Sequence, residues 1–389
     1  MISSLHEVKV PKETMTPRER WLAVLTRQKP DRVPMDYWST TEATAKLIRH
    51  IGLSSDSEEA LVAAFKGGGR RTRLGKRPID ALRRETLDRL HVDYVVSVGP
   101  RYVGPRLKPH TDVYGCRYRD IEYGTGAYGE CIYNPLAKYS SAEEIERNFT
   151  WPVPDWWDHS EIAEQIKGWD ETYPIRGGGS EPFLIYKNLR GQEQAFMDLV
   201  EHPDIVHYCL DKLFGLAYAN TERIYEQIPG KVMITYVAED MGAQDGLMFS
   251  VKHIREFLLP RMKRIIDLAH SAGAYVFHHN DGGVRKILPD MIALGIDALN
   301  PIQWRCNGME REGLKADFGS QIAFHGALDN QYTLPFGTVA EVRQEVLDNL
   351  RILGAGGGYI LAPCHNIQAV SNPENIVAMY ETCYEHGWM

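Results

Sequence analysis

Residues 232–246 read VMITYVAEDMGAQDG, and residues 275–283 read YVFHHNDGG. Each stretch begins as a short β-branched or aromatic run and ends in polar and glycine residues. Between them, Ser250 begins a segment with apolar residues at helical spacing, which ends near Gly273. A strand, a helix and a second strand in this order are typical of a βαβ unit with parallel strands. The two stretches therefore predict an α/β fold.

The same alternation of short apolar runs and helical segments continues on both sides of these stretches. The further candidate strands are residues 33–38, 93–98, 173–177, 183–186, 298–301, 322–326 and 359–362. Together they give about the number of strands that a (β/α)8 TIM barrel requires. A doubly wound open sheet is the alternative, but no G-x-G-x-x-G motif begins a helix after an early strand.

The barrel is predicted to be elaborated in its N-terminal third. We expect one domain over residues 1–389, with an N-terminal extension and an insertion at about residues 60–150. α/β barrels of this length are common as single domains. Glycine and tyrosine alternate in residues 112–133, and this pattern predicts a hairpin within the insertion.

The composition excludes several classes of protein. Of the 389 residues, 43% are hydrophobic and 25% are charged, and this balance excludes a disordered or collagen-like chain. The formal net charge of −8 provides no overall attraction for nucleic acid, and no apolar run reaches the length of a membrane span. The N-terminus has no apolar signal-peptide region, and the 6 cysteines form no C-x-x-C pair. We therefore expect a cytoplasmic protein with the acidic balance of a metabolic enzyme.

Polar residues collect directly after the predicted strands. In a parallel barrel the functional side chains lie at the carboxyl ends of the strands, which meet at one mouth. The residues at these positions are Glu239, Asp240, His278, His279, Asp281, Asn300, His325, Asp329, Cys364 and His365. We therefore expect the active site among them.

Several segments together resemble a known family. They are Thr16–Arg20 with Arg32–Pro34, Glu239–Gly242 with Gln244–Leu247, His279–Gly282, Gly326–Asp329 with Thr333–Thr338, and Ala362–Ile367, in this order. The chain resembles the uroporphyrinogen decarboxylase-like superfamily, which includes the decarboxylase and the corrinoid (methylcobamide) methyltransferases that pass methyl groups to coenzyme M and other acceptors. The resemblance implies a single TIM barrel and is closest to the methyltransferase branch.

The methyltransferases of this superfamily carry an H-x-C motif and a distant second cysteine, which bind a zinc ion that activates a thiol. The resemblance aligns His279-Asn280-Asp281 with the first motif, and His365, preceded by Cys364, with the second position. It therefore implies a divalent metal at the barrel mouth on His279, Asp281 and His365, with Cys364 as a further candidate ligand. Zinc is the first choice of ion, and such a set can also hold iron or manganese. A helix-capping Asp281 beside a hydrogen-bonded His279 is the alternative.

Three residues are candidates for acid–base catalysis, namely Glu239, His325 and His365. Glu239 and the adjacent Asp240 face opposite ways if the strand continues, and Glu239 is slightly preferred for the site. His325 can equally be a hydrogen-bonded histidine of the barrel wall. His278 is expected to face the opposite side from its neighbour and to serve packing.

The tetrapyrrole decarboxylases of the superfamily carry an R-Q-A-G-R stretch soon after the first strand, and its arginines pair with substrate carboxylates. Residues 35–41 read MDYWSTT and contain no arginine. Decarboxylation of uroporphyrinogen itself is therefore not expected.

Three functions follow, in order of preference. The first is a methyltransferase of a corrinoid-dependent methyl-transfer or demethylation system, with the corrinoid on a separate protein because no D-x-H-x-x-G segment is visible. The second is a lyase or decarboxylase acting on a small acid that is not a tetrapyrrole, and the third is a binding barrel without catalysis. The expected partners are a small-molecule methyl donor or acceptor, a corrinoid protein and a second copy of the chain, but no nucleic acid and no membrane.

Overall fold

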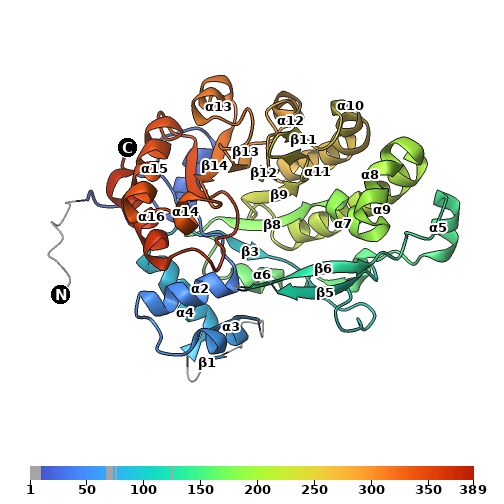
Figure 1. Cartoon of the computed structure of the whole chain (residues 1–389), viewed down its shortest axis with the longest axis horizontal. Coiled ribbons are helices and arrows are strands. Elements are labelled where there is room, and N and C mark those ends of the chain that lie inside the picture. Colours follow the sequence, from blue (N-terminus) through green and yellow to red (C-terminus); the bar gives the residue numbers. More distant parts are fainter. Residues whose placement is uncertain (1–9, 67–72, 75–76, 123, 125) are drawn as a thin grey trace. The chain divides into compact units, whose positions relative to one another are not determined.

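The structure is a computed structural model that describes residues 10–66, 73–74, 77–122, 124 and 126–389. The remaining positions of the predicted insertion, 67–72, 75–76, 123 and 125, lie outside the described residues. Figure 1 follows the chain through its helices and strands. Two compact units are present: a first unit of residues 1–94, 301–304 and 310–389, and a second unit of residues 95–300 and 305–309. One domain over residues 1–389 stays a prediction.

Parallel strands form the centre of the second unit. They are β3 (Val96–Val98), β8 (Ile175–Ser180), β9 (Ile234–Ala238), β12 (Tyr275–His279) and β13 (Ala298–Ile302), of which the last begins in this unit. They pair in the order β3-β8-β9-β12-β13, each parallel to the next. The predicted α/β class and parallel strands are thereby confirmed, whereas the closed eight-stranded barrel stays a prediction.

Helices cover one face of these strands. They are α7 (Pro182–Arg190), α8 (Gln192–Glu201), α9 (Pro203–Gln227), α10 (Val251–His253), which continues through a π-helical turn at Ile254–Leu258 into α11 (Leu259–Ser271), and α12 (Leu288–Leu294). Helix α9 contacts β8, and α11 contacts β8, β9 and β12 (Figure 1). In the described part of the chain, none of the helices combines the length and apolar character needed to cross a membrane.

Strand alternation separates the helix-covered face from the opposite face, which we call the inner face. The hydroxyls of Thr235 on β9 and Tyr225 on α9 share a hydrogen bond of 2.5 Å, so Thr235 faces the helices. Tyr236 follows Thr235 and therefore lies on the inner face. The register pairs Tyr236 with Phe277 of β12, which places Phe277 and His279 on the inner face as well.

The excursion between β3 and β8 contains the predicted hairpin. Its strands β5 (Arg117–Glu122) and β6 (Ala127–Tyr133) pair antiparallel, which confirms the hairpin predicted within residues 112–133. The other elements of the unit are β4 (Arg101–Tyr102) paired with β7 (Trp157–Asp158), α5 (Ala142–Asn148), a short 3-10 turn at Pro154–Trp156, α6 (Ile162–Ile166), and the pair β10 (Gly242–Ala243) and β11 (Gly246–Leu247).

The first unit contains a second set of parallel strands. β14 (Ala323–Leu328) pairs parallel with β15 (Tyr359–Pro363). The other elements are α1 (Pro17–Leu25), α2 (Thr41–His50), α3 (Glu58–Lys66), β1 (Arg73–Leu74), β2 (Arg77–Pro78), α4 (Ile79–Arg89), α13 (Arg311–Phe318), α14 (Thr333–Phe336), α15 (Val339–Ile352) and α16 (Pro373–His386). The strand predicted at 33–38 is reduced to an isolated parallel bridge between Met35 and Leu361. Pro34 has no N–H group, which limits further pairing there.

Residues 183–186, predicted as a strand, belong instead to helix α7. Pro182 begins the helix, and Phe183, Tyr186 and Leu189 are buried at helical spacing. An apolar run of four residues does not by itself distinguish a strand from a buried helix. The proline at the first helical position and the three-residue spacing decide for the helix.

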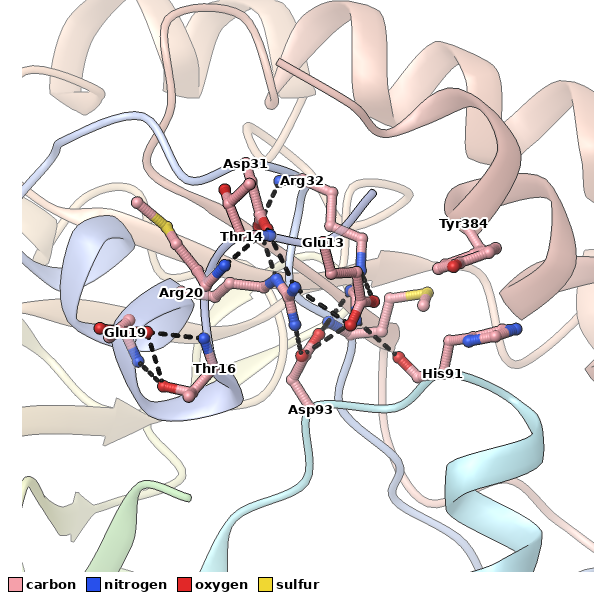
Figure 2. A network of polar contacts seen from close by, with 12 residues as sticks. Glu13, Thr14, Thr16, Glu19, Arg20, Asp31, Arg32, His91, Asp93 and Tyr384 are labelled. Carbon is pink, nitrogen blue, oxygen red and sulfur yellow. Dashed lines mark hydrogen bonds and ion pairs between the residues drawn. The ribbon is translucent and has the colours of Figure 1, made fainter. Parts of the chain in front are cut away.

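Arg20 and Arg32 form a buried ionic network in the first unit (Figure 2). Arg20 donates to Asp31 at 2.6 Å and to Asp93 at 2.8 Å, and Arg32 donates to the other oxygen of Asp93 at 2.6 Å. Arg20, Arg32 and Asp93 are each at most 2% exposed. Buried charges of this kind are tolerated because each one is paired, and removing one partner leaves the others unpaired.

Replacing Asp31 with asparagine is expected to flatten the loss of stability in acid. Burial alone would raise the pKa of Asp31, but hydrogen bonds from Arg20 and from the amides of Thr14 and Met15 hold that pKa well below its usual value of 3.8. A lowered folded-state pKa contributes stability above about pH 4 and loses that contribution as the pH falls. D31N should therefore be less stable than the wild type at pH 7 and should lose less stability by pH 3.

Urea unfolding at pH 7, 5 and 3 measures this effect. Glu222→Gln, which neutralises an exposed carboxylate on α9, is the control and should follow the wild type at each pH. If the free energies of unfolding of D31N and the wild type differ by the same amount at pH 7 and at pH 3, the prediction is contradicted.

Candidate functional site

His279 stands at the carboxyl end of β12, on the inner face and beside β13. Its Nδ1 donates to Oδ1 of Asn300 at 2.6 Å, which the parallel register places directly opposite. Because a side-chain amide oxygen can only accept, Nδ1 carries a proton, and Nε2 is the ring nitrogen that faces the two carboxylates. Nε2 lies 3.7 Å from Oδ1 of Asp240 and 3.9 Å from Oδ1 of Asp281. These two separations are too long for hydrogen bonds.

Two tight loops hold the carboxylates in place. One follows β9 and carries Asp240, and the other follows β12 and carries Asp281. A Cβ atom on Gly242 would lie 2.4 Å from the carbonyl oxygen of Asp281, and one on Gly282 would lie 2.6 Å from the amide nitrogen of Ala243. Gly282 also has a φ of +82°, a conformation that favours glycine. The main chains of the two loops can touch because both positions lack a side chain.

Asn280 and His278 brace these loops from the helix-covered side. Oδ1 of Asn280 accepts from the amide of Met241 at 2.9 Å, and its Nδ2 lies 3.3 Å from Nε2 of His278. Burial lowers the pKa of His278 to about 4, so its ring is neutral and its Nδ1 donates to the carbonyl of Val237 at 2.7 Å. His278 thus has the packing position that strand alternation predicts.

Glu239 lies next to Asp240 in the chain but has a different environment. It is 1% exposed, and its two oxygens accept from the amide of Phe183, in the first turn of α7, at 3.2 and 3.1 Å. Burial raises the pKa of Glu239 well above its usual value, and the Phe183 amide opposes this rise. Asp240, not Glu239, is therefore the carboxylate beside His279, although the sequence slightly favoured Glu239. A catalytic role for Glu239 stays a prediction.

Glu181 adds a further carboxyl group that sequence reasoning missed. It follows β8 directly, and burial followed by the charges of Asp240 and Asp281 raises its pKa. A signal was present, because Glu181 occupies the carboxyl end of a strand. Because residues 183–186 were wrongly predicted as a strand, Glu181 was not recognised as the residue that follows one.

Cys364 and His365 belong to the first unit, where they follow β15. Cys364 is buried, and its Sγ donates to the carbonyl of Ile302 at 3.2 Å, as a packed thiol does. His365 is half-buried. The predicted metal-binding roles of both residues, and the catalytic role of His365, stay predictions.

His325 is fully buried in the first unit. Its Nε2 lies 3.1 Å from Oδ2 of Asp36, which also accepts from Nε1 of Trp38 at 2.8 Å. Burial raises the pKa of Asp36, but the bond with His325 and its other hydrogen bonds outweigh this and hold the pKa low. The rings of Trp21 and Trp38 have centroids 6.0 and 5.7 Å from that of His325. This environment suits a hydrogen-bonded histidine of the wall, and its catalytic role stays a prediction.

Comparison with known proteins identifies relatives. The family model described as "Uroporphyrinogen decarboxylase (URO-D)" matches residues 158–386. Uroporphyrinogen decarboxylase from Nitrosococcus oceani is 26% identical over 218 residues, covering 55% of this chain and 54% of the relative. The enzyme of the same name from Neisseria meningitidis is 28% identical over 217 residues, covering 55% of each. The matched segment thus spans about half the length of these relatives.

A solved structure extends the likeness to nearly the whole chain. A methyltransferase from Methanosarcina mazei superposes with a TM-score of 0.63 at 19% sequence identity, covering 95% of this chain and 98% of that one. This likeness concerns the fold. Because the family model matches more than half of the 389 residues, the chain belongs to the uroporphyrinogen decarboxylase (URO-D) family.

Proposed function

We propose that this protein is a methyltransferase of a corrinoid-dependent methyl-transfer or demethylation system, assisted by a divalent metal. The arrangement of His279, Asp240 and Asp281 at the ends of β9 and β12 carries the proposal. The fold likeness to a methyltransferase supports it. The lack of arginine in residues 35–41 argues against a substrate with many carboxylates.

The residues around His279 fit a divalent ion. Nε2 of His279 lies 3.7 Å from Oδ1 of Asp240 and 3.9 Å from Oδ1 of Asp281, a spacing suited to ligands of one ion with bonds of about 2.0–2.2 Å. Asn300 accepts from the other ring nitrogen, which is the usual support of a metal-binding histidine. Zinc is the first choice of ion. His365 of the first unit and Cys364 are the further ligands predicted from the sequence.

The ion would act as a Lewis acid that lowers the pKa of an acceptor thiol or polarises a methoxy or amine donor. The residues of the chain position it. Asn300 orients the His279 ring, and the ring of Tyr236 stacks on His279 with centroids 5.6 Å apart. Asp240 also accepts from the amide of Asp281 at 3.2 Å, which limits the movement of both carboxylates.

The proposal includes a closed (β/α)8 barrel and a corrinoid carried by a separate protein. Five parallel strands in sequential order support the barrel. The second candidate function is a lyase or decarboxylase acting on a small acid, and the decarboxylase relatives favour it. The two functions differ in whether methylcobalamin is consumed.

Demethylation of methylcobalamin tests the proposal. Purified protein is mixed with methylcobalamin and either small thiols or tetrahydrofolate, and the corrinoid spectrum is followed. We expect loss of the methylcobalamin spectrum at a rate that depends on protein and acceptor. Release of CO2 from a small acid, with no effect of methylcobalamin on turnover, would instead establish the second candidate.

A further inference from the structure

Arg176 on β8 faces the same side as the His279 site. A Cβ atom on the next residue, Gly177, would lie 3.0 Å from Ile224 of α9, so Gly177 faces the helices. Because successive residues of a strand alternate, Arg176 lies on the inner face with Tyr236 and His279. Arg176 is half-buried.

The guanidinium is placed by neutral groups. Its Nε donates to the hydroxyl of Ser97 on β3 at 3.1 Å, and its Cζ lies 5.6 Å from the centre of the Tyr236 ring. Burial raises the pKa of Tyr236, so the phenol is uncharged at neutral pH. The hydroxyl of Ser97 and the ring of Tyr236 are both uncharged, so neither of these two contacts supplies a negative charge to Arg176.

Within the described residues, two buried arginines of the same unit are, unlike Arg176, paired with carboxylates. Arg190 pairs with Asp198 at 2.7 Å, and Arg261 pairs with Asp211 at 2.7 Å. A guanidinium has five N–H donors in a fork that matches an oxyanion. Arg176 carries the same guanidinium group as Arg190 and Arg261. Its contacts are a hydroxyl and an aromatic ring, where the other two arginines contact a carboxylate.

Tyr236 links Arg176 to the candidate metal site. The Tyr236 ring lies 5.6 Å from Arg176 on one side and 5.6 Å from the His279 ring on the other. Two such separations place Arg176 no more than about 11 Å from the His279 ring. The inner face thus has a cationic end at Arg176 and an acidic end at Asp240 and Asp281.

We propose that Arg176 binds the carboxylate of a small monoanionic substrate whose opposite end reaches the His279 site. This inference rests on the proposed function, since it names the substrate class of that site. The cation at Arg176 can pair with one carboxylate, whereas a second negative charge placed toward Asp240 and Asp281 would be repelled by them, so one negative charge is favoured over two. One carboxylate also agrees with the lack of arginine in residues 35–41.

Calorimetric titration with benzoate and benzamide tests the proposal. The two probes have similar size and shape and differ in charge, so their difference isolates the oxyanion. We expect the wild type to prefer benzoate, and Arg176→Gln to weaken benzoate binding by about tenfold or more while changing benzamide binding by less than about twofold. Arg176→Lys keeps the charge but lacks the fork, so its benzoate affinity should be intermediate.

Arg223→Gln is the matched control. Arg223 lies on α9 and pairs with Asp155 at 2.7 Å, so its loss removes the same charge from the same unit but not from the inner face. Its benzoate affinity should equal that of the wild type. Thermal unfolding of each variant verifies that it is folded. If Arg176→Gln fails to fold, the benzoate affinity of Arg176→Lys is compared with that of the wild type instead.

Two results would overturn the proposal: equal benzoate affinity of the wild type and the Arg176 variants, or no preference of the wild type for benzoate over benzamide. The titrations are repeated after metal removal with a chelator. The preference for benzoate should persist there, because Arg176 is not a proposed ligand. A persistent preference in a protein that fails to demethylate methylcobalamin would refute the proposed function and leave the carboxylate site intact.

Discussion

Replacing His279 with alanine is expected to remove a stoichiometric divalent metal and to lower methyl transfer by about a hundredfold to a thousandfold. His279 supplies the only nitrogen among the three proposed ligands of the second unit, and its Nε2 lies within 3.9 Å of both carboxylates. Without the imidazole, the proposed ligands of the second unit would offer the ion only the two carboxylates of Asp240 and Asp281. Elemental analysis of untagged protein by plasma mass spectrometry measures the metal, and methylcobalamin demethylation measures the turnover.

His50→Ala is the control for this experiment, because His50 is exposed at the end of α2. It should keep the metal content and turnover of the wild type. Asn300→Ala should have an intermediate effect, with metal affinity lowered by about 10- to 100-fold, since it releases the His279 ring without removing a ligand. If the wild type and the His279 variant both purify without stoichiometric metal, the metal centre is refuted.

Replacing Asp93 with alanine is expected to lower the free energy of unfolding by about 3–5 kcal/mol. Its carboxylate accepts from Arg20 at 2.8 Å, from Arg32 at 2.6 Å and from the amide of Met35 at 3.0 Å. Alanine would leave all three donors in a buried environment without this acceptor. Urea unfolding followed by tryptophan fluorescence measures the effect.

Asp348→Ala is the matched control for the charge. Asp348 pairs with Arg351 at 3.0 Å on the surface of α15, so its loss should cost less than about 1 kcal/mol. Asp93→Asn keeps the shape of the side chain and should lie between alanine and the wild type. An Asp93→Ala variant within about 1 kcal/mol of the wild type would mean that the network contributes little to stability.

Much of the fold could be predicted from the sequence, because alternation of short apolar runs with helical segments is a local signal. Strands β9, β12 and β13 lie where that pattern predicts them, within one or two residues. The run at 183–186 was predicted incorrectly, because a four-residue apolar stretch fits a strand and a buried helix equally well. Pro182 marks a helix start, but the burial of Tyr186 and Leu189 on one face of that helix is visible only in the structure.

The site could be predicted only in part. His279 and Asp281 are two residues apart on one strand end, so their proximity follows from the chain itself. The bond between His279 and Asn300 depends on the register of two strands, which no local pattern reveals. The choice between Asp240 and Glu239 depends on the first turn of α7, whose Phe183 amide holds Glu239. Contacts of this kind arise between elements far apart in the chain.

The glycines at positions 242 and 282 separate the geometry of the two loops from the chemistry of the side chains that the loops carry. A side chain at either position would meet main-chain atoms, which cannot rotate away. The distance between the two loops is therefore a property of the backbone, independent of the side chains that project from it. Exchanging Asp240 or Asp281, the proposed ligands, for another residue changes one side chain and leaves the backbone of the loops unchanged. The side chains at positions 240 and 281 can therefore change without a change in the backbone, whereas a side chain added at position 242 or 282 would force the two loops apart.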